Sequence, residues 1–76
     1  MIIHVKTVGT LKSLEEGTQS VDIEVPAGTP VASIIKRLNL KDWEIGFVLI
    51  NNRRSSQESI LKENDELTLV APLAGG

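Results

Sequence analysis

The segment VPAGTPVASIIKRLNL, residues 25–40, decides the fold because it predicts the end of a strand, a turn and one amphipathic helix. The apolar residues of this helix recur at the spacing i, i+3, i+4 and i+7: Val31, Ile34, Ile35 and Leu38. Thr29 suits the N-cap, and Pro30 suits the first helical position, where no backbone N–H is needed. Asn39 tolerates the left-handed conformation that often ends a helix. We therefore expect a helix from Pro30 to about Leu38.

Two alternating segments precede the helix, residues 2–8 and 20–25, and a period of two predicts strands with one buried face. The residues expected to face the core are Ile3, Val5, Val21, Ile23 and Val25. Those expected to face outward are His4, Lys6, Asp22 and Glu24. A hairpin of the two strands sets the basic members of the outward group opposite the acidic ones, which helps to define the register.

After the helix, the chain is expected to form a short turn and a further strand. Asp42 is expected to cap the turn, and Trp43 to pack against the core. Residues 47–50 (FVLI) are apolar on both faces, as in a central strand. Residues 51–54 (NNRR) are predicted to form a turn, followed by an irregular segment or a brief strand within 55–61.

A last strand is predicted from Glu66 to about Leu73, after a turn in which Asn64 is the left-handed residue. Leu67 and Leu69 would point to one face of this strand, and Thr68 and Val70 to the other. The helix supplies the crossover that lays a later strand parallel to an earlier one. The element order predicts an α+β fold of the β-grasp (ubiquitin-like) type, a mixed sheet packed on one main helix. Residues 1–72 would form this domain and residues 73–76 a flexible C-terminal tail.

The composition excludes several classes of protein. The chain has 76 residues and no cysteine, so it has no disulfide, thiol nucleophile or cysteine-based zinc site. Its single histidine rules out a multi-histidine metal site within one chain. The formal charge of −2 does not favour nucleic acid as a partner, and the longest apolar run is far too short to span a membrane. No signal peptide is visible, so we expect a cytoplasmic protein.

The C-terminus is the remaining candidate for chemistry. Pro72 has no N–H to donate, so strand pairing is expected to stop there. Gly75 and Gly76 lack a Cβ and can pass through a channel too narrow for other residues. ATP can convert the terminal carboxylate to a mixed anhydride with AMP, which sulfide, a thiol or an amine can then attack. The tail is therefore predicted to be a substrate rather than a catalyst, and a frayed end without function is the alternative.

Four motifs connect the chain to a known family: VPAGTPV (25–31), VLINN (48–52), LKENDEL (61–67) and APLAGG (71–76). With them the whole chain resembles the MoaD/ThiS-type sulfur carriers, small ubiquitin-like proteins of molybdopterin and thiamine biosynthesis. The resemblance implies that a ubiquitin-activating-like adenylyltransferase adenylates the carboxylate of Gly76, and that a sulfur donor protein then converts it to a thiocarboxylate. Gly75 and Gly76 match the family tail directly. Many members have Pro-Pro-Val where this chain has Ala71-Pro72-Leu73, so both branches stay open.

The resemblance also implies the partners and the role of the chain. A larger synthase subunit or another acceptor enzyme would receive the sulfur, and Leu73 with Pro72 would dock the tail. Val70 and Thr68, on one face of the last strand, are expected to lie against a partner. The carrier would be no enzyme itself, although it would count as the small subunit of a molybdopterin synthase in that branch. It would bind no cofactor, because the activating partner uses the ATP.

Two alternatives of different classes remain. A ubiquitin-like modifier would be joined through Gly76 to lysines of other proteins. A β-grasp interaction module would bind partners without activation of its tail.

Overall fold

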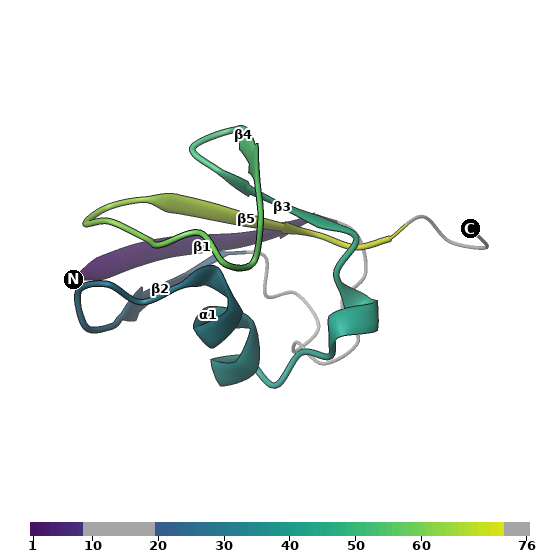
Figure 1. The fold of residues 1–76 in the computed structure, drawn as a ribbon, viewed down its shortest axis with the longest axis horizontal. Coiled ribbons are helices and arrows are strands. Elements are labelled where there is room, and N and C mark those ends of the chain that lie inside the picture. Colours follow the sequence, from purple (N-terminus) through teal and green to yellow (C-terminus); the bar gives the residue numbers. More distant parts are fainter. Residues whose placement is uncertain (9–19, 73–76) are drawn as a thin grey trace.

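The computed structural model describes residues 1–8 and 20–72. These residues form a five-stranded sheet with one α-helix against one of its faces (Figure 1). The elements are β1 (Ile2–Val8), β2 (Ser20–Glu24), α1 (Val31–Arg37), the 3-10 helix η1 (Asp42–Glu44), β3 (Phe47–Ile50), β4 (Arg53–Ser55) and β5 (Glu66–Val70). The strand order is β2-β1-β5-β3-β4. β1 and β5 are parallel, and the other neighbours are antiparallel. This mixed sheet on one helix confirms the predicted β-grasp architecture.

The core lies between the sheet and α1. Its buried members are Ile3, Val5, Ile23, Val25, Val31, Ile34, Ile35, Leu40, Val48, Leu61, Leu67 and Leu69. The predicted alternation in β1 is confirmed, but Val21 is 37% exposed and does not belong to the core. Val21 lies in the edge strand β2, which has one neighbour among the described strands, so less of the described molecule covers Val21.

The charge pairing across the first hairpin is confirmed for one pair. His4 lies opposite Asp22, and Nδ1 of the histidine is 2.8 Å from Oδ1 of the aspartate. Lys6 lies opposite Ser20 rather than an acidic residue. Its Nζ pairs instead with Oε1 of Glu66 in β5, at 3.4 Å. Strand β5, the parallel neighbour of β1, therefore provides Lys6 with the acidic partner that β2 does not provide.

The start of α1 differs from the prediction. Pro30 is the N-cap residue, with an extended backbone (φ −82°, ψ 162°), and the helix begins one residue later, at Val31. The hydroxyl of Thr29 donates to the carbonyl oxygen of Pro26 at 2.7 Å. Thr29 therefore stabilises the preceding turn and does not cap the helix.

A distant loop caps the helix with backbone carbonyls. The N–H of Val31 donates to the carbonyl oxygen of Ser59 at 3.0 Å, and that of Ala32 to Gln57 at 2.9 Å. These bonds satisfy N–H groups that a helix leaves unpaired at its first turn, so no capping side chain is required. At the other end Asn39 has φ 61°, the left-handed conformation that the sequence predicts.

The short turn η1 forms where it was expected, but Trp43 does not pack against the core. Trp43 is 68% exposed, whereas its neighbour Glu44 is buried. The Oε1 atom of Glu44 accepts a hydrogen bond from the N–H of Lys41 at 3.1 Å. Because Glu44 turns inward to close this turn, Trp43 points outward, and Ile45 packs against the core instead. The side chain of Asp42, the expected cap, lies outside the described part.

A two-residue turn joins β3 to β4. Asn51 and Asn52 both have a positive φ, 53° and 68°, which is the conformation of the tightest hairpin turns. β4 therefore begins at Arg53, and the prediction that all of residues 51–54 form a turn is wrong. The Oδ1 atom of Asn51 accepts a hydrogen bond from the N–H of Glu66 at 3.0 Å, which ties this turn to the start of β5.

β5 is the central strand of the sheet, between β1 and β3. It follows a turn in which Asn64 has φ 65°, as predicted. Leu67 and Leu69 are fully buried, which confirms the face they were expected to take. The strand ends at Val70, three residues before the predicted Leu73.

Candidate functional site

The tail root, Ala71 and Pro72, is the point where the chain leaves the sheet (Figure 1). The N–H of Ala71 donates to the carbonyl oxygen of Val8 in β1 at 2.9 Å. On the other side, the N–H of Gly46 donates to the carbonyl oxygen of Val70 at 2.7 Å. Pro72 has no N–H and is exposed. In the described part of the chain, the last bond to the sheet is therefore that of Ala71, in line with the stop predicted at Pro72.

Residues 73–76 lie outside the described residues. The roles expected for Leu73, Gly75 and Gly76 therefore stay predictions, as does the boundary between a domain of residues 1–72 and a tail. The structure supplies the point of attachment. Four extended residues beyond Pro72 reach at most about 13–14 Å, so a partner that acts on Gly76 must bind close to the tail root.

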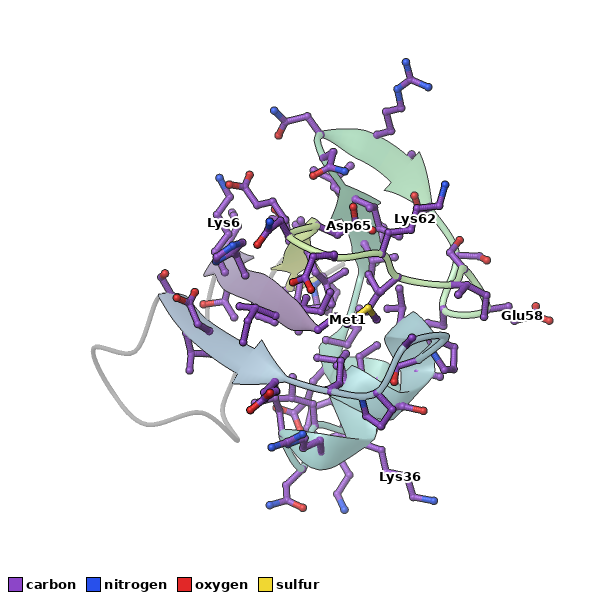
Figure 2. The ribbon with its side chains drawn as sticks, turned by 90° about the vertical axis from the view of Figure 1, so that its left-hand side faces the viewer. Met1, Lys6, Lys36, Glu58, Lys62 and Asp65 are labelled. Carbon is purple, nitrogen blue, oxygen red and sulfur yellow. The ribbon has the colours of Figure 1, made fainter. Side chains whose placement is uncertain are left out.

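The sheet face opposite α1 is covered by no other described element, and we call it the open face. Figure 2 shows Lys6 on this side of the sheet and Lys36 of α1 on the opposite side of the molecule. The observed register places its residues in three rows across the strands. The rows are Val8, Val70 and Phe47; Lys6, Thr68, Leu49 and Arg54; and His4 with Glu66.

The apolar row of the open face lies beside the tail root. Val8 is 50% exposed, and Val70 and Phe47 are half-buried. The guanidinium of Arg54 stacks on the ring of Phe47, with Cζ 4.4 Å from the ring centroid. An apolar centre with a charged rim is the usual anatomy of a protein–protein interface. The open face therefore has the composition of a candidate interface next to the point where the tail begins.

Thr68 lies on the predicted face of β5, together with Val70, but it is buried. It is 2% exposed, because it lies in the central strand between Lys6 of β1 and Leu49 of β3. Its side chain therefore supports the open face but does not offer itself to a partner. Val70 is accessible, and its docking role stays a prediction. Val8, which the sequence does not single out, lies beside Val70 only because β1 and β5 pair in parallel.

The hydroxyl of Thr68 gives a prediction about stability. Its Oγ1 is buried without a hydrogen-bond partner among the described residues. We expect Thr68→Val to raise the free energy of unfolding by about 1 kcal/mol, because an unpaired buried hydroxyl carries a desolvation cost and valine has nearly the same shape. In a domain of this size that is an increase in Tm of about 4–8 °C, measured by circular dichroism.

Thr29→Val is the matched control for this stability measurement. The hydroxyl of Thr29 does have a partner, the carbonyl oxygen of Pro26. The same substitution should therefore lower Tm at position 29. A loss of stability at both positions would contradict the prediction for Thr68.

His4 gives the open face a dependence on pH. The hydrogen bond to Asp22 is the main cause that raises the pKa of His4 above its ordinary value of 6.5, and the negative charge of Asp22 acts in the same direction. A raised pKa means that the fold favours protonated His4. The stabilisation is therefore complete below about pH 6.5 and is lost as pH rises through the raised pKa of the folded protein.

An NMR titration of the His4 ring tests this assignment. We expect a midpoint above 6.5 in the unmodified chain, and a shift back toward 6.5 in Asp22→Asn, which removes the charge and weakens the acceptor. Glu24→Gln removes one charge from the same strand without touching His4, and should leave the midpoint almost unchanged. Equal midpoints in the unmodified chain and in Asp22→Asn would disprove the assignment.

Among the described residues, neither a metal-binding cluster nor a membrane-spanning helix is present. No group of three histidine, aspartate or glutamate side chains that could hold a metal ion occurs in residues 1–8 and 20–72. No helix in this part of the chain is both long and apolar enough to cross a membrane.

A family model matches residues 5–76, from the middle of β1 through the last residue of the chain. The chain belongs to the ThiS family. This finding confirms the resemblance to ubiquitin-like sulfur carriers that the four sequence motifs indicate. The match includes the tail root and the Gly-Gly terminus. No curated protein matches the chain.

Solved structures of low sequence identity share the fold of this ThiS-family chain. SAMP1 of Haloferax volcanii, a small archaeal modifier protein, has a TM-score of 0.77 and 22% identity, with all of both chains covered. The complex of subunits 1 and 2 of molybdopterin-converting factor from Helicobacter pylori contains a chain with a TM-score of 0.65 and 22% identity, again with full coverage of both. Urm1 of Trypanosoma brucei has a TM-score of 0.72 and 16% identity over 99% of this chain and 95% of its own. These similarities confirm the β-grasp fold.

Proposed function

We propose that this ThiS-family chain is a sulfur carrier in molybdopterin or thiamine biosynthesis, with the sulfur held as a thiocarboxylate on Gly76. One observation carries the proposal: the family match runs to residue 76, whereas the last described hydrogen bond between this end of the chain and the sheet is at Ala71. The Gly-Gly terminus is thus joined to a tail root that lies beside an accessible apolar row. This arrangement suits a terminus that a partner enzyme must take into its own active site.

The chemistry begins with ATP bound by the partner. A carboxylate oxygen of Gly76 attacks the α-phosphorus of ATP, pyrophosphate leaves, and an acyl-adenylate forms. Sulfide delivered by a donor protein attacks the acyl carbon, AMP leaves with the bonding electron pair, and a thiocarboxylate remains. The chain contributes the reacting carboxylate and, at Gly75, a backbone without a side chain that fits a narrow channel. In this proposal the chain is a substrate of the enzyme, in the cytoplasm where ATP is available.

The open face is the proposed docking surface for the adenylyltransferase. Val8 and Val70 offer apolar contact next to the tail root, and Pro72 with Leu73 would continue that contact along the tail. Binding beside the tail holds the terminus near the reacting atoms and so lowers the entropy cost of the reaction. A larger synthase subunit would bind after activation. The Helicobacter pylori structure, a complex of subunits 1 and 2 of molybdopterin-converting factor, suggests this kind of partner.

Mass spectrometry of the intact chain tests the proposal. The chain is incubated with ATP, the adenylyltransferase of the same organism and a sulfur donor protein. We expect the mass increase that accompanies replacement of one oxygen by sulfur, located on the C-terminal peptide. If no acyl-adenylate forms, the tail is not activated, and the chain would act only as an interaction module.

A protein modifier is the second candidate, because SAMP1 is a small archaeal modifier protein with the same fold. In that case a lysine amine, rather than sulfide, would attack the acyl-adenylate and form an isopeptide bond. Conjugates that survive thiol treatment in cell extracts, and that disappear when Gly76 is deleted, would favour this function.

A further inference from the structure

Gly46 contacts the tail root from the β3 side of the sheet. Its N–H donates to the carbonyl oxygen of Val70 at 2.7 Å, while Ala71 is held from the β1 side by Val8 at 2.9 Å. The peptide unit that joins Val70 to Ala71, at the end of β5, is therefore hydrogen-bonded on both sides. The backbone of Gly46 forms one wall of the path that the chain follows out of the sheet.

Limited space, and not backbone conformation, disfavours a side chain at position 46. A Cβ placed on Gly46 would lie 3.0 Å from both Cα and N of Pro72, and 3.2 Å from the carbonyl carbon of Ala71. These are backbone atoms, which cannot rotate away as the end of a flexible side chain can. Among the described glycines, only Gly28 has a positive φ, at 85°. Gly46 is also exposed, so an added methyl group would meet the tail root and not the core.

We propose that Gly46 is a positioning residue for the tail, because its missing side chain leaves room for the backbone of Ala71 and Pro72 and so sets the direction in which the chain leaves the sheet at Pro72. The importance of this direction for adenylation rests on the proposed function; the contact itself does not. The ring of Pro72 restricts φ to about −65°, so this residue has little freedom to absorb a displacement. A shift of the tail root would therefore move the start of the tail relative to a partner bound on the open face.

Gly46→Ala tests the proposal with two readouts. Hydrogen exchange, measured by NMR, should become faster at the N–H of Ala71 and of residue 46, since both bonds depend on the position of the tail root. The kcat/KM for adenylation, measured by ATP–pyrophosphate exchange with the adenylyltransferase of the same organism, should fall by about tenfold, since a misplacement of about 1 Å can cost up to 100-fold.

Gly28→Ala is the matched control, because it makes the same chemical change for the opposite structural reason. No atom lies within 4 Å of a Cβ at Gly28, but its positive φ makes any side chain unfavourable. We expect this variant to lower Tm by about 4–8 °C. Its exchange rate at Ala71 and its kcat/KM should match those of the unmodified chain.

The outcomes separate the inference from the proposed function. Unchanged exchange at Ala71 in Gly46→Ala, or faster exchange with an unchanged kcat/KM, would overturn the positioning role. A tenfold loss in Gly28→Ala as well would also overturn it, because the effect would then follow stability. If the unmodified chain is never adenylated, the proposed function fails, and the exchange comparison alone decides whether Gly46 sets the tail root.

Discussion

Deletion of Gly75 and Gly76 is expected to abolish adenylation while it changes the free energy of unfolding by less than about 0.5 kcal/mol. The activity is lost because Leu73 and Ala74 would then end the chain, short of the reacting phosphate and with a Cβ on the last residue. We expect stability to be kept because, among residues 1–8 and 20–72, the hydrogen bonds that hold the end of the chain to the sheet stop at Ala71. ATP–pyrophosphate exchange and thermal unfolding of the same preparation measure the two effects.

Gly76→Ala separates the two contributions of the terminus. It keeps the length of the chain and the carboxylate but adds one Cβ, so adenylation should fall without reaching zero. Full activity in the deletion variant would refute the role of the carboxylate. A large fall in Tm on deletion would show that the tail packs on the domain, which contradicts an end that is free for a partner.

Val8→Asp is expected to weaken binding to the adenylyltransferase by at least about 30-fold, equivalent to about 2 kcal/mol. Val8 is half exposed in the apolar row beside the tail root, so the variant should fold almost normally. In the complex, however, the new carboxylate would be removed from water without a partner, which is strongly unfavourable. Isothermal titration calorimetry with the purified enzyme gives the change in Kd.

Val21→Asp is the matched control for this binding measurement. It introduces the same charge at another partly exposed valine. Val21 belongs to the edge strand β2 and lies on the sheet face opposite the open face. We expect its Kd to equal that of the unmodified chain, although its Tm should fall because Val21 faces the side of the core. An equal loss of affinity in both variants would show that the effect comes from net charge and not from the open face.

Much of the fold follows from interactions between residues that are close in sequence. The helix predicted from Pro30 to Leu38 forms as Val31–Arg37, because its apolar stripe needs only one face to bury. Asn39 and Asn64 take the left-handed conformation, since few other residues with a side chain tolerate it. Pairing stops at Pro72 because the missing N–H is a property of that residue alone.

The predictions that were wrong concern positions where other groups compete for the same place or the same hydrogen bond. Thr29 would cap an isolated helix, but carbonyls of Gln57 and Ser59 satisfy the first turn of α1 and leave Thr29 to the preceding turn. Trp43 points outward because Glu44 turns inward to bond to the backbone. Each correction depends on a competitor for the same position or the same hydrogen bond, and the local pattern does not reveal that competitor.

The candidate site divides in the same way. The sequence by itself determined the Gly-Gly terminus, the break at Pro72 and the family, because these depend on residue types and their order. Only the tertiary structure decided that Val8 lies beside Val70, that Thr68 is buried and that Gly46 contacts the tail root. Those contacts join β1, β3 and β5, which are far apart in the chain, and their register is set by the packing of the whole core against α1.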